Sequence, residues 1–592
     1  MSPAKNVIPS CLLPLLISGL LSASGCCCVG TTIKWYPPVY AKPKKVALCD
    51  SLAEAESHYA AAVCLEAKGN PECVDRYYQV AQLTCVQELD PLNGNARASQ
   101  LHKSSLRKLV DAGQQFGRFD ATTGLTVWTD GHEHVVPIKR RGFPWKAKDF
   151  QTVIPVGRYA TNEFRTAYFC PGVGVPVVVV RNGCERHTFL SRQSAFNATL
   201  VMKPSQNCSS CQSGTHSAEL ELVDTLRIRK IYVEEQPYKI AWDISAAIAY
   251  RVSTGDRNWF SAFIDPGSTE GEGQLHMLEP YQPGKIPVVF VHGLLSDPFT
   301  WAQMVNELRA KPGFVDNFQV WVYEYPTGRP FVSSAAKLRQ ELQAARKKFD
   351  PMQHDPQLSN IVMVGHSLGG LITKLQVTSS GDELWNAVAK CPIDTLRINQ
   401  QSREELRSFF FFEPSPDITR VVFMGTPHQG SAYARRCVGR LSSALVSMPA
   451  EDRAQHDEMI QCNPGVFSDE VSRRIPTSID LMNPKSPLLR EISQLPINPN
   501  VHIHSVIGDY CWRIGFGRSD LVVPVKSAKE PRAETELTIR ARHSDVNKHS
   551  KAVAELHCIL QQHLAASRSQ VVQPLCLESN RELRAPVVVT AN

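Results

Sequence analysis

The chain carries little net charge and lacks the motifs by which many proteins bind nucleic acids. Its 592 residues include 64 basic and 57 acidic side chains, a formal net charge of +7. A charge this small for the length does not favour nucleic-acid binding. The sequence also has no RNP, zinc-finger or P-loop motif. We therefore expect no nucleic-acid partner.

Metal-binding patterns are also scarce. One C-x-x-C pair, Cys208 and Cys211, is present among 18 cysteines, and no second C-x-x-C or H-x-x-x-H accompanies it. A structural zinc ion needs four ligands, so we expect no metal at this pair, which fits a local disulfide or free loop cysteines better. The number of cysteines suits an oxidising compartment, in which some of them pair as disulfides.

The N-terminal apolar run, residues 11–21, is too short to span a membrane. Lys5 precedes it and small residues follow at 22–25, which is the order of a cleaved signal peptide. Residues 23–26 resemble the bacterial lipobox, whose cysteine is acylated, although alanine stands at 23 where leucine is preferred. We expect residues 1–28 to be a signal peptide with a lipobox-like end and Cys26 to be lipidated. The chain would then reach the cell envelope, anchored to a bacterial membrane through this lipid or secreted to the periplasm.

The rest of the chain is too long for a single core and divides into segments of different pattern. Residues 29–50 are proline-rich, as in a tether. Residues 51–120 begin with a capping box and predict a small helical segment. In residues 121–270, short apolar runs alternate with Gly, Pro and Asn, which predicts a mostly β domain without a chemical motif. Residues 566–592 are expected to form a C-terminal tail.

Residues 280–565 alternate apolar runs with helical stretches, which predicts an α/β domain with a mostly parallel sheet. Such runs are apolar on both faces because helices cover both sides of a parallel sheet. The expected strands are residues 287–291, 319–323, 361–364, 420–424 and 502–507.

Two stretches of this domain leave alternatives open. An insert at 431–500 either caps the site, with an apolar inner face for acyl chains, or packs as ordinary core. The four phenylalanines at 409–412 predict a buried strand leading into 420–424, with the edge of an acyl pocket as the alternative.

A G-x-S-x-G motif follows directly after the apolar run at 361–364. In this context a buried strand turns sharply into a helix and exposes one serine hydroxyl. Gly365 and Gly369 flank the serine because strand and helix pass too closely there for side chains. We therefore predict that Ser367 is a nucleophile.

Acyl transfer at a serine also needs a base, an acid that orients the base, and donors for the oxyanion. In the fold that carries this elbow, the acid follows a late strand and the histidine follows the last strand. Asp520 and His543 occupy these places, with Asp509 and His549 as the alternatives.

The backbone N–H groups of Leu368 and Leu294 are the expected oxyanion donors. Leu368 follows the nucleophile, and Leu294 lies in the loop after the run at 287–291. Gly293 lets that loop turn inward. His292 precedes this glycine, and we interpret it as a structural residue that forms hydrogen bonds.

Taken together, these pieces resemble the α/β-hydrolase superfamily and, within it, the lipase/esterase group. The matching stretches are residues 291–294, 365–370, 425–431 and 519–524. The stretch at 425–431 also looks similar to that of inositol deacylases that remodel lipid anchors. The resemblance covers about half of the chain, residues 280–565, and implies a serine hydrolase that acts on a carboxylic ester.

We therefore expect an esterase or lipase that cleaves ester or lipid substrates through an acyl-enzyme, without a metal or organic cofactor. An acyltransferase or thioesterase would use the same residues, because no motif encodes the acceptor. A non-catalytic envelope binding or scaffold protein is the third possibility. The joint presence of Ser367, Asp520, His543 and both oxyanion loops argues against it, since a degraded enzyme would have lost at least one of them.

Overall fold

The computed structural model describes residues 50–579 except 89–94, 130, 157–163, 183–188, 191–192, 205–217, 234–235, 255–272, 433–449 and 514–516. The expected signal peptide, Cys26, most of the tether, the Cys208–Cys211 pair and part of the 431–500 insert lie outside these residues. Among the described helices, none combines the length and the apolar character needed to cross a bilayer. The eight cysteines whose side chains the structure describes form no disulfide, so the expected disulfides are not found among them.

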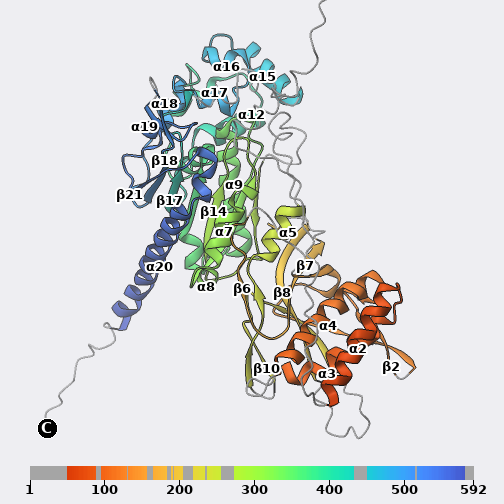
Figure 1. The fold of residues 1–592 in the computed structure, drawn as a ribbon. Coiled ribbons are helices and arrows are strands. Elements are labelled where there is room, and N and C mark those ends of the chain that lie inside the picture. The colour runs from red at the N-terminus through yellow and green to blue at the C-terminus, as the bar shows by residue number, and fades with distance from the viewer. Residues whose placement is uncertain are drawn as a thin grey trace, which may run out of the picture. The chain divides into compact units, whose positions relative to one another are not determined.

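The chain separates into two compact units, one within residues 30–255 and the other from residue 256 onward. In the first unit, three helices precede a set of short strands (Figure 1). The helices are α2 (Asp50–Ala67), α3 (Cys73–Glu88), α4 (Ala96–Gln115) and, near the end, α5 (Ala246–Thr254). The strands of its main sheet are β4 (Ile138–Arg141), β5 (Phe150–Pro155), β7 (Val175–Asn182), β8 (Gln193–Pro204) and β9 (Ala218–Asp224), in the order β4-β9-β8-β7-β5.

Smaller sheets complete the first unit. One is formed by β1 (Phe119–Asp120), β2 (Gly124–Thr129) and β3 (His132–Val136). The others pair β10 (Lys230–Val233) with β11 (Gln236–Lys239) and β6 (Phe169–Cys170) with β12 (Trp242–Asp243).

One hydrophobic core joins the helices and the main sheet of the first unit. Tyr77 of α3, Leu109 of α4 and Val179 of β7 all belong to it and are buried. The sequence of α4 explains why it is a helix that packs on this core. Asn95 caps its first turn, and the buried residues of the helix form one face. The helical and β-rich segments therefore fold as one body, which ends at Gly255, before the expected boundary at 270.

The second unit is built on a seven-stranded sheet in the order β13-β15-β14-β16-β17-β18-β21. The strands are β13 (Gln274–Met277), β14 (Ile286–Val291), β15 (Phe318–Glu324), β16 (Ile361–His366), β17 (Ile418–Met424), β18 (His502–Gly508) and β21 (Thr535–Ile539). All neighbours are parallel except β13, which is antiparallel to β15. The five expected runs are therefore strands, and the unpredicted β13 moves the start of the sheet before residue 280. A hairpin, β19 (Cys511–Arg513) with β20 (Gly517–Ser519), follows β18.

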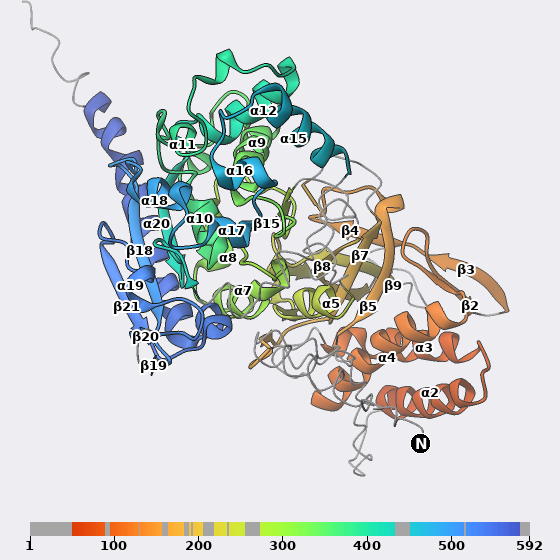
Figure 2. The same ribbon diagram turned by 90° about the horizontal axis from the view of Figure 1, so that it is seen from above.

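Helices cover both faces of this sheet, with α9 packed on α10 and α12, and α7 packed on α20 (Figures 1 and 2). The helices before the insert are α7 (Ala302–Arg309), α8 (Phe314–Asn317), α9 (Phe331–Phe349), α10 (Leu368–Lys374), α11 (Glu383–Asn386) and α12 (Gln400–Phe410). Within the insert lie α15 (Ala450–Cys462), α16 (Asp469–Arg473), α17 (Ser478–Leu481) and α18 (Pro487–Gln494), and α19 (Val525–Ala528) and α20 (Ser550–Ser579) follow it. Two expectations are corrected here. Helix α20 runs past residue 566, where a tail was expected, and Phe409 and Phe410 end a helix instead of forming a buried strand.

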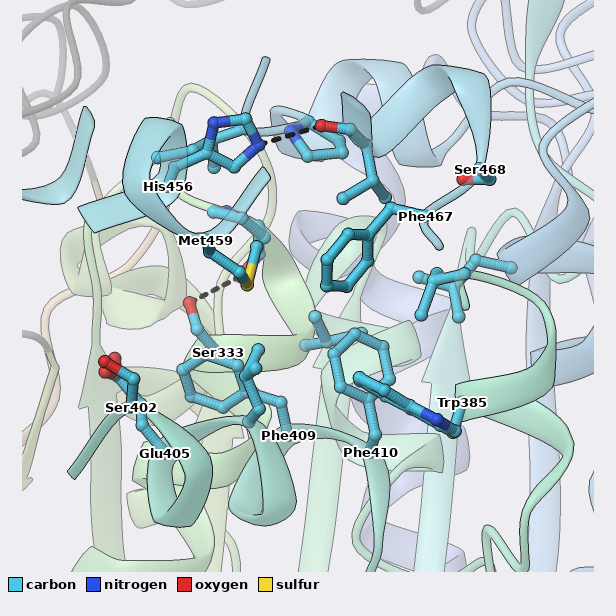
Figure 3. A pocket seen from close by; sticks show the side chains of 18 of the residues that line it. Ser333, Trp385, Ser402, Glu405, Phe409, Phe410, His456, Met459, Phe467 and Ser468 are labelled. Carbon is cyan, nitrogen blue, oxygen red and sulfur yellow. Dashed lines mark hydrogen bonds between the residues drawn. The ribbon is translucent and has the colours of Figure 1, made fainter. Parts of the chain in front are cut away.

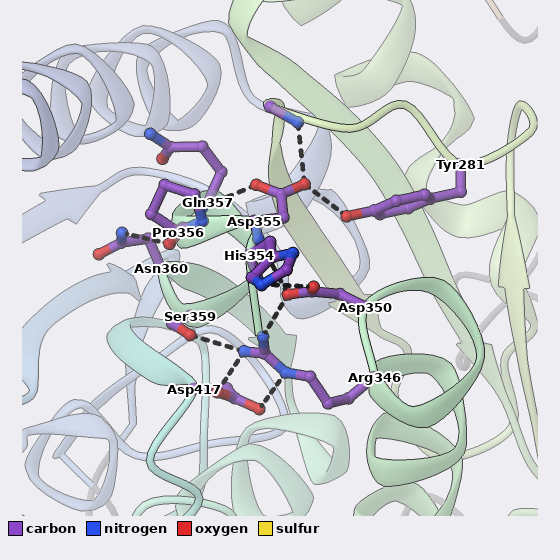
Figure 4. A network of polar contacts seen from close by, with 11 residues as sticks. Tyr281, Arg346, Asp350, His354, Asp355, Pro356, Gln357, Ser359, Asn360 and Asp417 are labelled. Carbon is purple, nitrogen blue, oxygen red and sulfur yellow. Dashed lines mark hydrogen bonds and ion pairs between the residues drawn. The ribbon is translucent and has the colours of Figure 1, made fainter. Parts of the chain in front are cut away.

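A polar network holds the edge of the sheet where β16 and β17 begin (Figure 4). The Arg346 guanidinium, near the end of α9, donates to the carboxylates of Asp350 (3.0 Å) and Asp417 (3.2 Å from Nε). The Tyr281 hydroxyl donates to Asp355 (2.5 Å). Burial and the neighbouring Asp355 raise the pKa of Tyr281 above its usual range, so this hydroxyl remains a donor. The network lies opposite the edge at which Ser367 follows β16.

A second buried contact ties α20 to the sheet. Arg420 of β17 donates to the rings of His504 in β18 and His563 in α20. A guanidinium only donates, so each ring accepts through the nitrogen that faces it. Each ring then donates from its other nitrogen, His504 to Thr535 Oγ1 (2.9 Å) and His563 to the Asn360 carbonyl (2.9 Å). Both rings are therefore neutral. Burial, together with the charge of Arg420, lowers the pKa of each to about 4.

Candidate active site

Ser367 lies at the sharp turn between β16 and α10. Its φ of 54° is in the left-handed region, which a residue other than glycine occupies only when its surroundings hold it there. The Ser367 N–H donates to the Met424 carbonyl (2.9 Å), and its own carbonyl accepts from the Gly370 N–H (3.0 Å). These bonds fix the strained turn from the end of β17 and from the first turn of α10.

The glycines around Ser367 allow strand and helix to meet. A Cβ atom on Gly365 would lie 2.6 Å from the Gly369 carbonyl oxygen. One on Gly369 would overlap the carbonyl oxygens of Val291 and His292. Because these obstacles are backbone atoms, no rotamer change could make room. The two glycines therefore set how closely α10 can approach β14 and β16.

The structure brings Ser367, His543 and Asp520 into one hydrogen-bonded chain. His543 Nε2 lies 2.8 Å from Ser367 Oγ, across 176 residues of sequence, and His543 Nδ1 lies 2.7 Å from Asp520 Oδ2. The other carboxylate oxygen of Asp520, Oδ1, accepts the backbone N–H groups of Val522 (2.9 Å) and Val523 (2.6 Å). Asp520 is buried, so its charge acts on the His543 ring with little screening by water.

The alternative residues have other partners. Asp509 is ion-paired with Arg518 (2.7 Å from Nε) at the β19–β20 hairpin. His549 accepts the backbone N–H of Lys551 (3.2 Å) at the start of α20. Neither contact involves Ser367 or His543, so the arrangement supports Asp520 and His543.

The loop after β14 passes directly over the serine. A Cβ atom on Gly293 would come 3.0 Å from Ser367 Cβ, so a larger residue there would crowd the serine. Within the described part of the chain, the N–H groups of Leu294 and Leu368 donate to no protein acceptor. For Leu368 this is expected, because the first N–H groups of a helix lack an intrahelical partner. Both groups are thus available to an oxygen at the site.

His292 is engaged in the structure of this loop. Its Nδ1 donates to the Gly293 carbonyl (3.0 Å) and its Nε2 accepts from the Tyr325 N–H (3.4 Å). The ring stacks on Tyr325 with 4.3 Å between centroids. Burial lowers the pKa of His292 to about 4. It therefore remains neutral near pH 7, and because both of its ring nitrogens are already hydrogen-bonded it is not available as a base for Ser367.

Sequence reasoning missed the part played by His366. Its Nε2 lies 3.0 Å from the carbonyl oxygen of His543, and the two ring centroids are 4.9 Å apart. A carbonyl only accepts, so the His366 tautomer carries its proton on Nε2. Burial, then the charge of His543, lowers the pKa of His366 to about 3. This neutral ring holds the backbone of His543, and its position inside the G-x-S-x-G motif was the only available signal.

A buried ion pair was also missed. Lys374, at the end of α10, lies 3.0 Å from the Glu530 carboxylate, and both are buried. The pair links the helix that follows Ser367 to the chain between Asp520 and His543. Gly425, in the loop after β17, completes the surroundings, since a Cβ atom there would lie 3.4 Å from His543 Nδ1.

No cluster of three or more His, Cys, Asp or Glu side chains that could hold a metal ion occurs among the residues described here. The site consists of a serine hydroxyl in contact with the His543 imidazole, a buried carboxylate behind it and two backbone donors. Such a set can carry out acyl transfer without a metal.

Comparison with known proteins shows what part of the second unit is similar to. Residues 288–556 match the alpha/beta hydrolase family. Together with the mostly parallel sheet, this confirms the expected α/β-hydrolase fold. No curated protein matches the chain.

The solved structures to which this chain is similar include a lipase of Bacillus licheniformis in its mature form, at 16% identity and a TM-score of 0.30. That match covers 48% of this chain and 97% of the lipase. A lipase-esterase related protein of Clostridium acetobutylicum is similar at 11% identity, covering 48% of this chain and 98% of its own, with a TM-score of 0.23. A thermophilic esterase is similar at 13% identity, covering 50% and 96%, also with a TM-score of 0.23.

Proposed function

We propose that this chain is a serine hydrolase that cleaves carboxylic esters of lipid-like substrates through an acyl-enzyme. The observation that carries the proposal is the continuous contact from Ser367 Oγ through His543 to the buried Asp520. Its support is the serine's position on a strained turn at the end of a central strand, with free backbone donors beside it.

In the proposed reaction, His543 Nε2 takes the Ser367 proton as the hydroxyl attacks the ester carbonyl. Asp520 stabilises the imidazolium that forms. The N–H groups of Leu294 and Leu368 bind the oxyanion, and each such donor is worth about 3 kcal/mol of transition-state stabilisation. His543 then gives its proton to the leaving alcohol and activates the water that releases the acid.

The test is hydrolysis of p-nitrophenyl acetate and longer esters by the purified chain, beside Ser367→Ala. We expect turnover in the native protein and a loss of at least about 10³-fold in the variant, because the nucleophile is removed. Ser569→Ala, an exposed serine of α20, is the matched control and should not change the rate. Absence of turnover, with Ser367 unlabelled by a fluorophosphonate, would refute the proposal and favour a scaffold role.

We also propose that the chain is exported to a bacterial cell envelope and anchored through lipid on Cys26. Support comes from residues 5–26 of the sequence alone. Labelling with radioactive palmitate in a bacterial host tests this. Cys26→Ser should abolish the label and Cys28→Ser should not. Label retained in Cys26→Ser would contradict the assignment.

A further inference from the structure

A mostly apolar cavity, with charged side chains such as Arg329 and Glu405 on part of its lining, lies between helices that precede the insert and helices of the insert itself (Figure 3). Its volume is about 230 Å³, and its walls come from α11, α12, α15, the start of α9 and residues 467–488. The apolar side chains that line it include Trp385, Leu406, Phe409, Phe410, Met459 and Phe467. The two phenylalanines thus fit the alternative considered for residues 409–412, the edge of a pocket.

One end of the cavity is closed by aromatic rings. Trp385 meets Phe410 edge-on with 5.5 Å between centroids and Phe467 with 6.3 Å. The indole N–H of Trp385 is already bonded to the Cys391 carbonyl (2.7 Å), so the ring has no donor left for a ligand. Hydrocarbon can pack against this end, but a polar head group would find no hydrogen-bond donor there. Polar side chains, including Ser402 and His456, lie elsewhere on the lining (Figure 3).

Two chain segments are shared between the cavity and the candidate active site. Thr327 Oγ1 accepts the N–H of Leu295 in the loop over the serine, and Pro330 lines the cavity. Three residues span at most about 11 Å, so the cavity wall begins close to that loop.

The second shared segment approaches from the insert. Leu481 lines the cavity, and the next residue, Met482, accepts the N–H of Ser431 through its carbonyl. Ser431 ends the loop that begins at Gly425 beside the His543 ring. Both segments thus connect the wall of the cavity to the loops that lie beside Ser367 and His543.

The size of the cavity limits the length of a bound chain. A dry apolar cavity of about 150 Å³ holds benzene, with six carbons, so about 230 Å³ corresponds to roughly nine carbons. We propose that this cavity binds the acyl chain of the substrate and that the enzyme prefers linear acyl chains of about eight to ten carbons. The inference rests on the proposed ester hydrolysis and adds the class of acyl group and the residues that select it.

The test measures kcat/KM of the full-length chain on p-nitrophenyl esters from acetate to palmitate. Burial of one methylene favours binding about fourfold, so kcat/KM should rise up to this factor per carbon as far as C8–C10 and then level or fall. Met459→Trp fills the cavity and should lower kcat/KM for the decanoate at least about tenfold, with acetate unchanged. Met352→Trp makes the same exchange at a methionine that is 72% exposed and should leave the profile unchanged.

Phe409→Ala provides the opposite change, because it enlarges the cavity and should move the optimum to longer chains. It also keeps the test decisive if Met459→Trp melts at a lower temperature than the native protein. Hydrolysis of acetate with no chain-length preference, or with a preference that neither variant moves, would overturn the inference and leave the esterase proposal standing. No hydrolysis of any ester, with Ser367 unlabelled by a fluorophosphonate, would refute both.

Discussion

Replacing Asp520 by asparagine tests the roles proposed for the three site residues most sharply. The change keeps the size of the side chain and exchanges one carboxylate oxygen for an NH₂ group. The contacts of Asp520 decide which way the new amide must face. Oδ1 accepts two backbone N–H groups, from Val522 and Val523, and Oδ2 faces His543 Nδ1.

The amide oxygen should stay at the Oδ1 position. The opposite orientation would set the NH₂ group against the two backbone donors of Val522 and Val523. Each buried donor left unsatisfied costs about 1–3 kcal/mol, so this orientation is disfavoured by roughly 2–6 kcal/mol. The NH₂ group therefore faces His543 and donates to Nδ1. The His543 proton then moves to Nε2, which points at Ser367 and cannot accept its proton.

We expect Asp520→Asn to lower kcat about 10⁴-fold, equivalent to about 5.5 kcal/mol of transition-state stabilisation, with the fold intact. The assay is steady-state hydrolysis of a p-nitrophenyl ester, with thermal unfolding to check stability. Asp509→Asn is the control and should keep kcat within about twofold, because its partner Arg518 lies at the surface. An Asp520→Asn protein that retains more than a tenth of the native kcat would refute the reasoning.

Three further predictions concern the frame of the site. A methyl group on Gly370 would overlap the side chain of Thr426, so Gly370→Ala should lower the free energy of unfolding by about 1–3 kcal/mol. Adding Thr426→Gly should recover part of that loss in a denaturant double-mutant cycle, and strictly additive effects would contradict the contact. The pKa values of His504 and His563 are lowered to about 4 in the folded chain, so between pH 6.5 and 4 the unfolded state takes up protons that the folded state does not. Stability should therefore fall as the pH falls through this window, by up to about 1.4 kcal/mol per pH unit per histidine, and a melting temperature constant over that window would contradict it. His366→Leu removes the donor to the His543 carbonyl and should lower kcat more than it changes KM. His366→Gln can still donate a hydrogen bond and should recover part of the rate. Equal rates in the two variants would show that the hydrogen bond does not position His543.

Much of the α/β unit follows from local sequence. The buried parallel strands were predictable because a sheet covered on both faces needs apolar residues without alternation. The turn at Ser367 was predictable because the close approach of β16 and α10 admits only glycine at fixed distances from the serine. Asp520 and His543 could be named as candidates because each follows a late strand, and the order of residues along the chain can be read from the sequence.

The features that the sequence did not reveal depend on contacts between distant segments. The 409–412 run was interpreted as a strand because its composition is apolar and aromatic. The structure ends α12 at Phe410, where Phe409 and Phe410 line a cavity shared with Met459 and Phe467. Such a cavity has no local pattern, since it exists only after several helices have packed.

The same holds for the residues that position the catalytic candidates. The Lys374–Glu530 pair closes across 156 residues and the His366–His543 contact across 177. By itself, the sequence determined the strands, the elbow and the identity of the acid and base candidates, because backbone sterics and burial act on neighbouring residues. Only the tertiary structure decided which side chains hold His543 in place and where an acyl chain can lie, because those depend on distances between elements that the chain connects through long, variable segments.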